Sequence, residues 1–279
     1  MSGVYLEALR RTDGAACVVV GIPYDGGTSY RAGARTAPHA VREASQSIET
    51  YSPTLRRDLT DVSYADGGDL DLTGLDPKAV MERIADAIEE HLRAGRFVVS
   101  LGGDHSISIG TTSGSRRVHE DLAHVVFDAH LDMRPEYDGS EYSHACGTRH
   151  MSKAGPTVAL GIRSGSRSEF ADADAMLTAW SADLELPKAA RETIGTRPIH
   201  LSLDLDVLDP SIMAGTGTPE PGGATYKELR AAILALSDLN IVAVDLCEIS
   251  PNFDASGVSN VVAAELVREI ILGIGPGAE

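Results

Sequence analysis

Residues 125–132, Val-Val-Phe-Asp-Ala-His-Leu-Asp, are the stretch that decides the fold. They begin as a short apolar run of β-branched and aromatic residues, which is typical of a buried strand. The run ends in three potential metal ligands spaced two residues apart, Asp128, His130 and Asp132. Because side chains two apart in an extended chain project to the same face, we expect these three to share one coordination site at the end of a strand.

Two other segments repeat this arrangement of a strand-like run followed by polar side chains. Residues 199–203 lead into Asp204 and Asp206, which are again two residues apart. Residues 98–101 lead into a pair of glycines, which lets the chain turn tightly and present His105. Three strand ends therefore offer the following candidate ligands: His105, Asp128, His130, Asp132, Asp204 and Asp206.

The charges of these candidates indicate what the site could hold. The aspartates among them, if gathered closely, would repel one another strongly unless cations lay between them. Two divalent ions would balance the four carboxylates and leave the histidines neutral. Oxygen ligands with a little imidazole suit Mn²⁺ better than a metal that prefers thiolates, although Ni²⁺, Co²⁺ or Fe²⁺ could occupy the same ligands. We therefore predict a two-metal centre with two Mn²⁺ per chain.

The order of these motifs resembles that of the ureohydrolase family, the manganese-dependent hydrolases that include arginase and agmatinase. The resemblance covers most of the chain, is closest to archaeal-type agmatinases, and includes an Arg/Gly/Ala loop near the amino terminus. Any one motif is only suggestive, whereas all of them in this order are highly specific. They are residues 102–106 (GGDHS), 128–132 (DAHLD), 202–210 (SLDLDVLDP) and 215–223 (GTGTPEPGG), and the loop is residues 31–38 (RAGARTAP).

The resemblance implies how the candidates share the two ions. Asp128 and Asp204 would each bind both ions. These two shared carboxylates would hold the ions about 3.5–4 Å apart, where a water that contacts both loses a proton near neutral pH. The resulting hydroxide would attack the guanidino carbon of a substrate, and Asp132 would carry its proton to the leaving nitrogen. One ion would be bound by His105, Asp128, Asp132 and Asp204, and the other by Asp128, His130, Asp204 and Asp206.

Further residues are expected to bind the substrate. A guanidinium that loses its water shell needs a compensating anion, and the aspartates are already neutralised by metal. Glu248 follows a strand and matches the guanidinium-binding position of the family, with Asp245 as the rival. His144 matches the family histidine that shuttles protons to the product amine, a task that its ordinary pKa suits. His150 is the alternative, because two residues separate His144 from the Gly-Thr pair that directly follows this histidine in several agmatinases.

The tail of the substrate is less constrained by the sequence. Glu136, Asp138 and Glu141 surround the loop before His144, and their charges favour a cationic tail such as the ammonium of agmatine. Arg134 argues the other way, since it could pair with an acidic tail. We therefore expect hydrolysis of agmatine to putrescine and urea, with aminopropylagmatine, arginine, guanidinobutyrate and formiminoglutamate as alternative substrates.

Alternating strand and helix patterns predict the fold class. Such alternation is typical of a three-layer α/β/α fold around a mainly parallel sheet, which resembles that of arginases and of single-zinc deacetylases. Ligands in such folds gather at the carboxyl ends of the strands. The glycine pair at 67–68 is expected to be a turn. Strands are expected at 17–23, 96–101, 123–128, 157–161, 198–205 and 240–246, and helices after residue 36, at 76–95 and at 257–274.

Length and composition narrow the remaining possibilities. The 279 residues suit one domain over residues 1–279, and no apolar run approaches the ~18–20 residues that would span a bilayer. Residues 1–14 carry charges and lack the apolar centre of a secretion signal, so we expect a cytoplasmic protein. The formal net charge of −17 argues against a nucleic-acid partner. The resemblance implies a small-molecule guanidino substrate and a homo-oligomer, either a trimer or a hexamer.

Two residue types carry further hypotheses. Only 4 of the 24 basic residues are lysines, and an acidic chain poor in lysine resembles proteins adapted to a high-salt cytosol. The cysteines, Cys17, Cys146 and Cys247, are widely separated and without a Cys-x-x-Cys pair, so neither a disulfide framework nor a structural zinc site is expected. His200 is expected in the core, and His39, His91, His119 and His124 are expected to be solvated.

Overall fold

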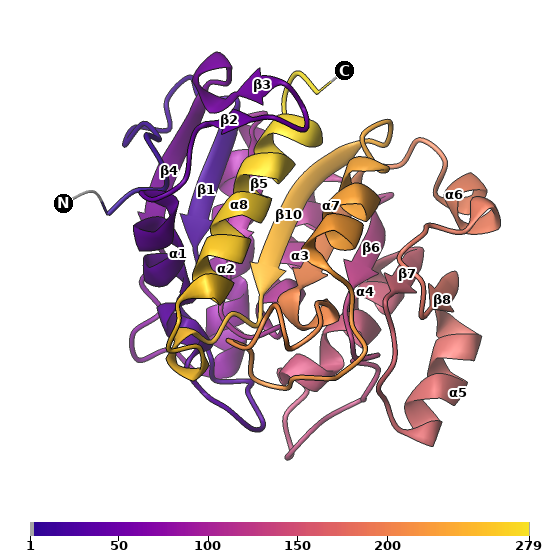
Figure 1. Cartoon of the computed structure of the whole chain (residues 1–279). Helices are drawn as coiled ribbons and strands as arrows, with labels where there is room; N and C mark the ends of the chain where they lie inside the picture. The colour runs from indigo at the N-terminus through magenta and orange to yellow at the C-terminus, as the bar shows by residue number, and fades with distance from the viewer. Residues whose placement is uncertain (1–2, 279) are drawn as a thin grey trace.

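The structure is a computed structural model that describes residues 3–278, and it is built around one eight-stranded sheet. Every adjacent pair of strands in this sheet is parallel, and the strand carboxyl ends meet at the lower edge in Figure 1. This confirms the expected parallel sheet and the predicted strands. In spatial order, the strands are β4 (Tyr64–Asp69), β1 (Cys17–Gly21), β5 (Phe97–Leu101), β10 (Ile241–Cys247), β9 (Ile199–Asp204), β6 (Ala123–Phe127), β7 (Thr157–Leu160) and β8 (Ala179–Ser181).

Helices cover both faces of the sheet, which confirms the three-layer arrangement (Figure 1). In the view of Figure 1, the helices in front are α1 (Ala37–Ser45), α7 (Tyr226–Leu234) and α8 (Val258–Gly273). Those behind are α2 (Pro77–Arg93), α3 (Ile107–Val118) and α4 (Gly147–Ala154). Two further helices lie toward the β8 edge, α5 (Arg167–Met176) and α6 (Lys188–Ile194).

The strands are apolar on both faces because each face is covered. In β1, Val19 packs into the cluster that includes α1, α7 and α8, whereas Val18 and Val20 pack into the cluster that includes α2. This alternation follows from the two-residue period of a strand. Each fully buried side chain of this size contributes about 1.5–3 kcal/mol to the stability of the fold. The two-sided core therefore holds the strand ends in fixed positions, and the candidate site lies at those ends.

Helix α2 begins and ends at the residues that the sequence predicts. The side chain of Asp76 accepts a hydrogen bond of 2.8 Å from the backbone N–H of Ala79, and Pro77 is the first helical residue. Past its carboxyl end, Gly95 has φ +74°, a conformation that favours glycine. The predicted apolar face is buried against the sheet and consists of Met81, Ile84, Ile88 and Leu92.

Gly67 and Gly68 do not form the predicted turn, because both lie within β4. Val19 of β1 pairs with Asp66 and Gly21 pairs with Asp69, so the glycines provide the extra residue of a β-bulge. Gly68 has φ +78°, which explains why the bulge requires glycine. The turn interpretation was therefore wrong, and it concealed an edge strand.

Three smaller features complete the comparison with the sequence. His124 is fully buried in β6 rather than solvated, and its Nδ1 lies 3.2 Å from Oγ1 of Thr157. A two-stranded antiparallel ribbon, β2 (Tyr51–Ser52) and β3 (Arg57–Asp58), was not predicted. Within residues 3–278, none of the helices combines the length and the hydropathy needed to cross a membrane.

Candidate metal centre and substrate cleft

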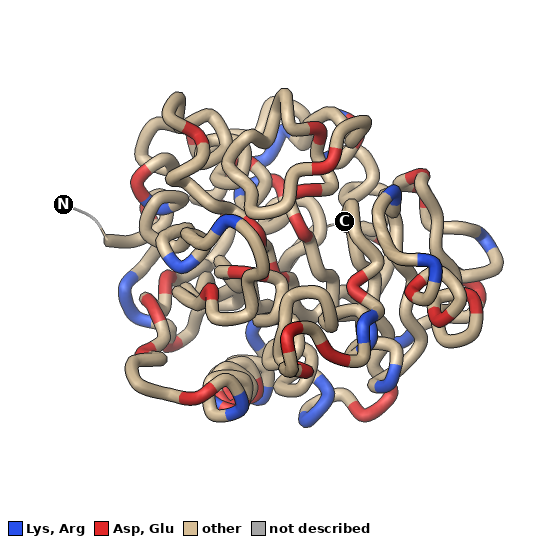
Figure 2. Tube along the Cα trace, turned by 90° about the horizontal axis from the view of Figure 1, so that it is seen from below, with Lys and Arg blue, Asp and Glu red and all other residues tan. Residues whose placement is uncertain are grey.

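The candidate site is assembled from four strands that are neighbours in the sheet. The order β5, β10, β9, β6 places their carboxyl ends side by side, although the chain forms them in a different order. His105 lies in the turn after β5, and Glu248 directly follows β10. Asp204 ends β9, and Asp128 directly follows β6. The structure thus brings together the three segments that the sequence singled out. Figure 2 views the molecule from this edge.

One nitrogen of His105 is surrounded by three carboxylates. Its Nδ1 lies 3.0 Å from an oxygen of Asp128, 3.0 Å from one of Asp132 and 3.3 Å from one of Asp204. A ring nitrogen carries at most one hydrogen, so it cannot satisfy three acceptors. Oδ2 of Asp128 is buried and accepts no hydrogen bond from any residue that the structure describes. An orphaned carboxylate oxygen beside two other carboxylates fits a bound cation.

A buried hydrogen-bond network holds the other nitrogen of His105. The hydroxyl of Ser202 donates its hydrogen to Asp245, so its oxygen, 2.9 Å from Nε2 of His105, is left to accept the Nε2–H. In the neutral ring that binds a metal, Nδ1 then has a lone pair and no hydrogen. This lone pair points at the three carboxylates. The lone pair and the carboxylates repel one another unless a cation lies between them. The network therefore leaves Nδ1 of His105 suited to bind a cation.

The remaining candidates form a second group around Asp128. Ligand atoms of Asp128, His130 and Asp206 all lie within 4.8 Å of one another, as do those of His105, Asp128, Asp132 and Asp204. Nδ1 of His130 lies 2.9 Å from Oδ2 of Asp206. Asp128 belongs to both groups, as expected of a shared ligand. Asp204 belongs only to the first, so its second shared position stays a prediction.

Titration of these carboxylates is strongly perturbed. Burial and the charge of Asp128 raise the pKa of Asp132 to about 6. Burial and the charges of Asp206 and Asp128 raise the pKa of Asp204 well above its ordinary value. Burial contributes most to both shifts, and the neighbouring carboxylates add to them. Divalent cations would displace the protons, and the oxygen and imidazole donors suit a metal such as Mn²⁺.

Two of the predicted residues have an uncommon backbone conformation. Asp132 has φ +48° and Glu248 has φ +60°, a region that residues other than glycine rarely adopt. Each such residue costs about 1–3 kcal/mol and persists only where the surrounding structure imposes it. Here the conformation directs one carboxylate toward His105 and the other toward His144.

Glu248 is a buried carboxylate with one occupied and one free oxygen. Its Oε1 accepts a hydrogen bond of 2.9 Å from the backbone N–H of His105 and lies 3.2 Å from Nδ1 of His144. Its Oε2 is buried and has no hydrogen-bond partner among residues 3–278. The two carboxylates with an orphaned oxygen, Asp128 and Glu248, thus both contact His105. The position of Oε2 suits the guanidinium contact predicted for Glu248.

Asp245, the rival for this contact, is fully occupied elsewhere. Besides Ser202, its carboxylate accepts a hydrogen bond of 2.7 Å from Oγ1 of Thr111 and lies 2.7 Å from Nε2 of His200. It is completely buried on the strand rather than at the strand end. Asp245 therefore acts as an anchor beneath His105. His200 is a buried core histidine, as expected.

A cleft of about 350 Å³ opens beside Asp132 and His144, and its volume is within the range typical of ligand sites. His144 lines it, whereas His150 lines a different hollow, where its Nε2 lies 3.1 Å from the backbone oxygen of Glu141. The structure thus favours His144 over His150. The cleft is lined by His130, Asp132 and His144, and also by Ser29, Arg134 and Glu169.

His144 is held from both sides of its ring. Nε2 lies 2.7 Å from the hydroxyl oxygen of Ser29, and Nδ1 faces Glu248. Burial alone would lower the pKa of His144, but the hydrogen bond and the charge of Glu248 outweigh it and raise the pKa to about 9. The ring is therefore charged at neutral pH. Sequence reasoning missed Ser29; the only available signal was its position just before the Arg/Gly/Ala loop at 31–38.

Apart from the candidate ligand Asp132, the acidic residue that lines the cleft is not one of those predicted to favour a cationic tail. Glu136, Asp138 and Glu141 are exposed, and none of them lines the cleft, so the basis they gave for a cationic tail falls away. Glu169 in the first turn of α5 lines it instead. One of its oxygens accepts the backbone N–H of its N-cap residue at 2.9 Å and lies 3.4 Å from Nε of Arg134. The cleft therefore offers an acid and a base that partly neutralise each other.

Comparisons with known proteins agree with this geometry. A model described as "Arginase family" matches residues 15–273. An agmatinase from Bacillus subtilis is 35% identical over 97% of this chain and 96% of its own length. An N(1)-aminopropylagmatine ureohydrolase from Thermococcus kodakarensis is 35% identical over 85% of this chain and 83% of its own. The crystal structure of a putative agmatinase from Clostridium difficile matches with a TM-score of 0.90 and 33% identity, covering 95% of this chain and 99% of the other.

Proposed function

The chain belongs to the arginase family and is a hydrolase that acts on guanidino C–N bonds; from this premise we propose that its substrate is agmatine, which it converts to putrescine and urea. One observation carries the proposal above the others. The orphaned oxygen of Asp128 faces the ring of His105, and Glu248, which has the second orphaned oxygen, accepts the backbone N–H of the same His105. Their partners Asp132 and His144 line the cleft. The proposed cation site and the proposed guanidinium contact thus meet at His105.

The metal site proposed here uses the six predicted ligands. The donors fit two Mn²⁺, because Asp128 belongs to both groups, with its orphaned Oδ2 toward His105 and its Oδ1 toward His130. When bound, the two ions supply a water that is activated to hydroxide near neutral pH. The first ion would be held by His105, Asp128, Asp132 and Asp204, and the second by Asp128, His130, Asp204 and Asp206.

The other residues would bind the substrate and move protons. Oε2 of Glu248 would accept an N–H of the guanidinium, and its negative charge would offset the cost of burying the cation. Asp132, which lines the cleft, would take a proton from the attacking water. His144 carries a proton at neutral pH and would donate it to the amine that leaves.

Agmatine is preferred because of what lines the far side of the cleft. The carboxylate of Glu169 would attract an ammonium tail, and the relatives at 35% identity include an agmatinase. Arg134 weakens this attraction, and an aminopropylagmatine ureohydrolase is equally similar. Hydrolysis of aminopropylagmatine is therefore the second candidate function, followed by arginine, guanidinobutyrate and formiminoglutamate.

A substrate panel tests the proposal. The purified chain is loaded with Mn²⁺, and urea or formamide release is measured from equal concentrations of all five substrates. We expect agmatine to have the highest kcat/KM. Faster turnover of arginine or guanidinobutyrate would overturn the assignment. The Glu248→Gln variant serves as the control, since it should bind the metal but lose turnover of every guanidino substrate.

We also propose that residues 1–279 form a single ureohydrolase domain that assembles as a trimer or hexamer in the cytoplasm and engages neither nucleic acid nor membrane. The single eight-stranded sheet supports the first part. The exposed rings of Tyr30 and Phe253, which both lie against Arg31, support the second, because clustered apolar side chains on a surface often mark contacts between subunits. Light scattering on the purified protein measures the number of chains in the assembly.

A further inference from the structure

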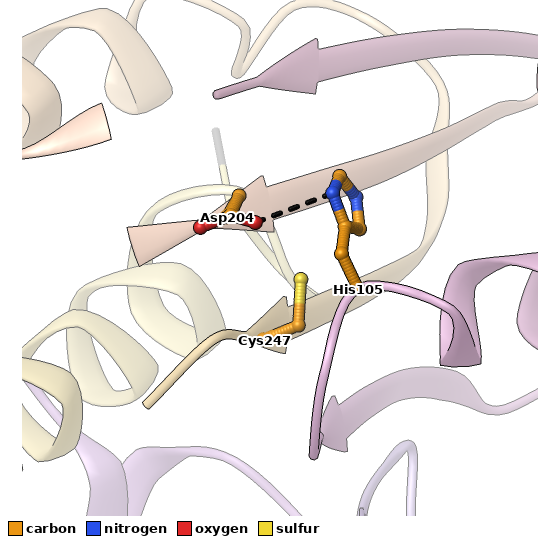
Figure 3. A group of neighbouring side chains, drawn as sticks. All are labelled: His105, Asp204 and Cys247. Carbon is orange, nitrogen blue, oxygen red and sulfur yellow. Dashed lines mark ion pairs between the residues drawn. The ribbon is translucent and has the colours of Figure 1, made fainter. Parts of the chain in front are cut away.

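The sulfur of Cys247 lies beside the position proposed for the first metal ion. Cys247 is the last residue of β10 and is fully buried. Its Sγ and the ligand atoms of His105 and Asp204 all lie within 4.8 Å of one another. Figure 3 shows the thiol pointing from its strand toward these two side chains. The thiol donates a weak hydrogen bond, 3.5 Å long, to the backbone oxygen of Leu203.

The sheet explains why the thiol reaches this place. In the parallel pairing of β10 with β9, Cys247 lies directly opposite Asp204. The other neighbour of β10 is β5, and the turn after β5 delivers His105. Cys247 and Asp245 are two residues apart and face the same side of the sheet. The thiol therefore lies closer to the carboxyl ends of the strands than Asp245, which anchors His105. The middle strand therefore carries a sulfur donor between two ligands from its flanks.

A sulfur donor changes which cations the site can hold. The other candidate ligands are carboxylates and imidazoles, which suit Mn²⁺, whereas a thiolate selects softer ions. Thiolates bind Zn²⁺ at about 2.3 Å in mixed sites with nitrogen and oxygen ligands. A buried cysteine without metal is ordinarily a small apolar side chain, and Cys17 in β1 is such a case. The proximity of His105 and Asp204 distinguishes Cys247 from it.

We propose that Cys247, His105 and Asp204 form an alternative, thiolate-containing site for a soft divalent cation such as Cd²⁺ or Zn²⁺. The cation would replace the thiol proton, which leaves to solvent, and no electron transfer is involved. Because His105 and Asp204 are shared with the position proposed for Mn²⁺, the soft cation and the first Mn²⁺ exclude each other. The inference concerns cation binding and does not depend on which guanidino compound is hydrolysed.

A spectroscopic titration tests this site without any assay of activity. Chelator-treated full-length protein is titrated with Cd²⁺, and the ultraviolet sulfur-to-cadmium charge-transfer absorption is followed. We expect saturation at one ion per chain in the native sequence and in the matched controls Cys17→Ala and Cys146→Ala. Cys247→Val should abolish the absorption and weaken Cd²⁺ binding by about tenfold or more. Excess Mn²⁺ should weaken the apparent binding of Cd²⁺ to the native sequence.

Several results would overturn the proposal. These are absorption that survives in Cys247→Val, absorption absent from the native sequence at one equivalent, or Cd²⁺ binding that is indifferent to Mn²⁺. Circular dichroism establishes that the variant is folded, and Cys247→Ser gives the same comparison with a side chain of nearly the same size. If the chain released no urea from agmatine, only the proposed function would fail, because the titration uses no substrate.

Discussion

Nε2 of His144 lies 2.7 Å from the hydroxyl oxygen of Ser29, on the wall of the cleft. This hydrogen bond holds the ring in the orientation that faces Glu248. We expect Ser29→Ala to lose about 0.5–1.5 kcal/mol of this positioning, which corresponds to roughly a two- to tenfold fall in kcat. KM should change little, because the proposed guanidinium contact of Glu248 is retained. Ser29→Thr keeps the hydroxyl and serves as the control; equal kcat values for the alanine variant and the native chain would contradict the role.

The pH dependence of stability should reveal the charge on His144. Burial alone would lower the pKa of His144, but Glu248 raises it to about 9. In the unfolded chain, a histidine has a pKa of about 6.5. The native state therefore binds this proton more tightly. The contribution of this proton to the free energy of unfolding is fully present below about pH 6.5 and is lost as the pH rises through about 9. The free energy of unfolding of the native chain, minus that of His144→Asn, should fall by a few kcal/mol over this range in denaturant titrations. A difference that stays constant would show that the pair is not charged.

Asp245 should control metal affinity without contacting the metal. In Asp245→Asn, the side-chain amide can donate a hydrogen to the oxygen of Ser202. The serine hydroxyl is then free to donate to Nε2 of His105, and Nδ1 is no longer held as the nitrogen with the lone pair. We expect the affinity for the first Mn²⁺ to fall by about 10–100-fold. Titration monitored by the paramagnetic signal of free Mn²⁺ measures this. Asp238→Asn, at an exposed ion pair with Arg191, should leave the affinity unchanged.

Metal removal should destabilise the fold. Chelation leaves the buried carboxylates around His105 without a counter-charge, so the unfolding midpoint should fall and Mn²⁺ should restore it. An ion at a hundred times its dissociation constant adds about 2.7 kcal/mol. Asp128→Asn removes a ligand from both groups and should abolish the response to Mn²⁺ in calorimetry. If this variant were stabilised as much as the native chain, Asp128 would not be a shared ligand.

Salt should stabilise the chain if its acidic, lysine-poor composition is an adaptation. Figure 2 shows acidic positions spread around the whole trace rather than gathered on one side. With a net charge of −17, their mutual repulsion is long-ranged in dilute buffer, whereas at 1 M salt the Debye length shrinks to about 3 Å. The unfolding midpoint and the activity should therefore both rise from dilute buffer to molar KCl. Indifference of both to KCl would remove the hypothesis.

The sequence predicted best what local periodicity determines. The apolar runs identify six of the eight strands of the sheet, and the spacing of Asp128, His130 and Asp132 places them at a strand end. Strand β4 was missed because its glycines form a bulge, which interrupts the alternation that identifies a strand. Strand β8 was missed because it has only three residues, all partly exposed.

The parts of the site that depend on distant contacts could not be predicted in the same way. Ser29 and His144 are 115 residues apart, and nothing in either segment indicates that they meet. Glu169 caps its own helix, a role that explains its presence without any cleft. The positive φ of Glu248 is imposed by its surroundings, because no local signal selects it. Loops of separate origin thus decide which side chains line the cleft.

The position of β10 between β5 and β9 has a consequence for biosynthesis. The ribosome produces β10 after β5 and β9, so β10 enters the sheet between them only after both have been synthesised. Until it does, Asp245 cannot support His105, and Glu248 is not in place. A nascent chain that still lacks this strand therefore has scattered acids but no organised receptor for ions. The proposed capture of metal therefore follows the entry of β10 into the sheet, and a chain that ends before this strand gains no protection from it.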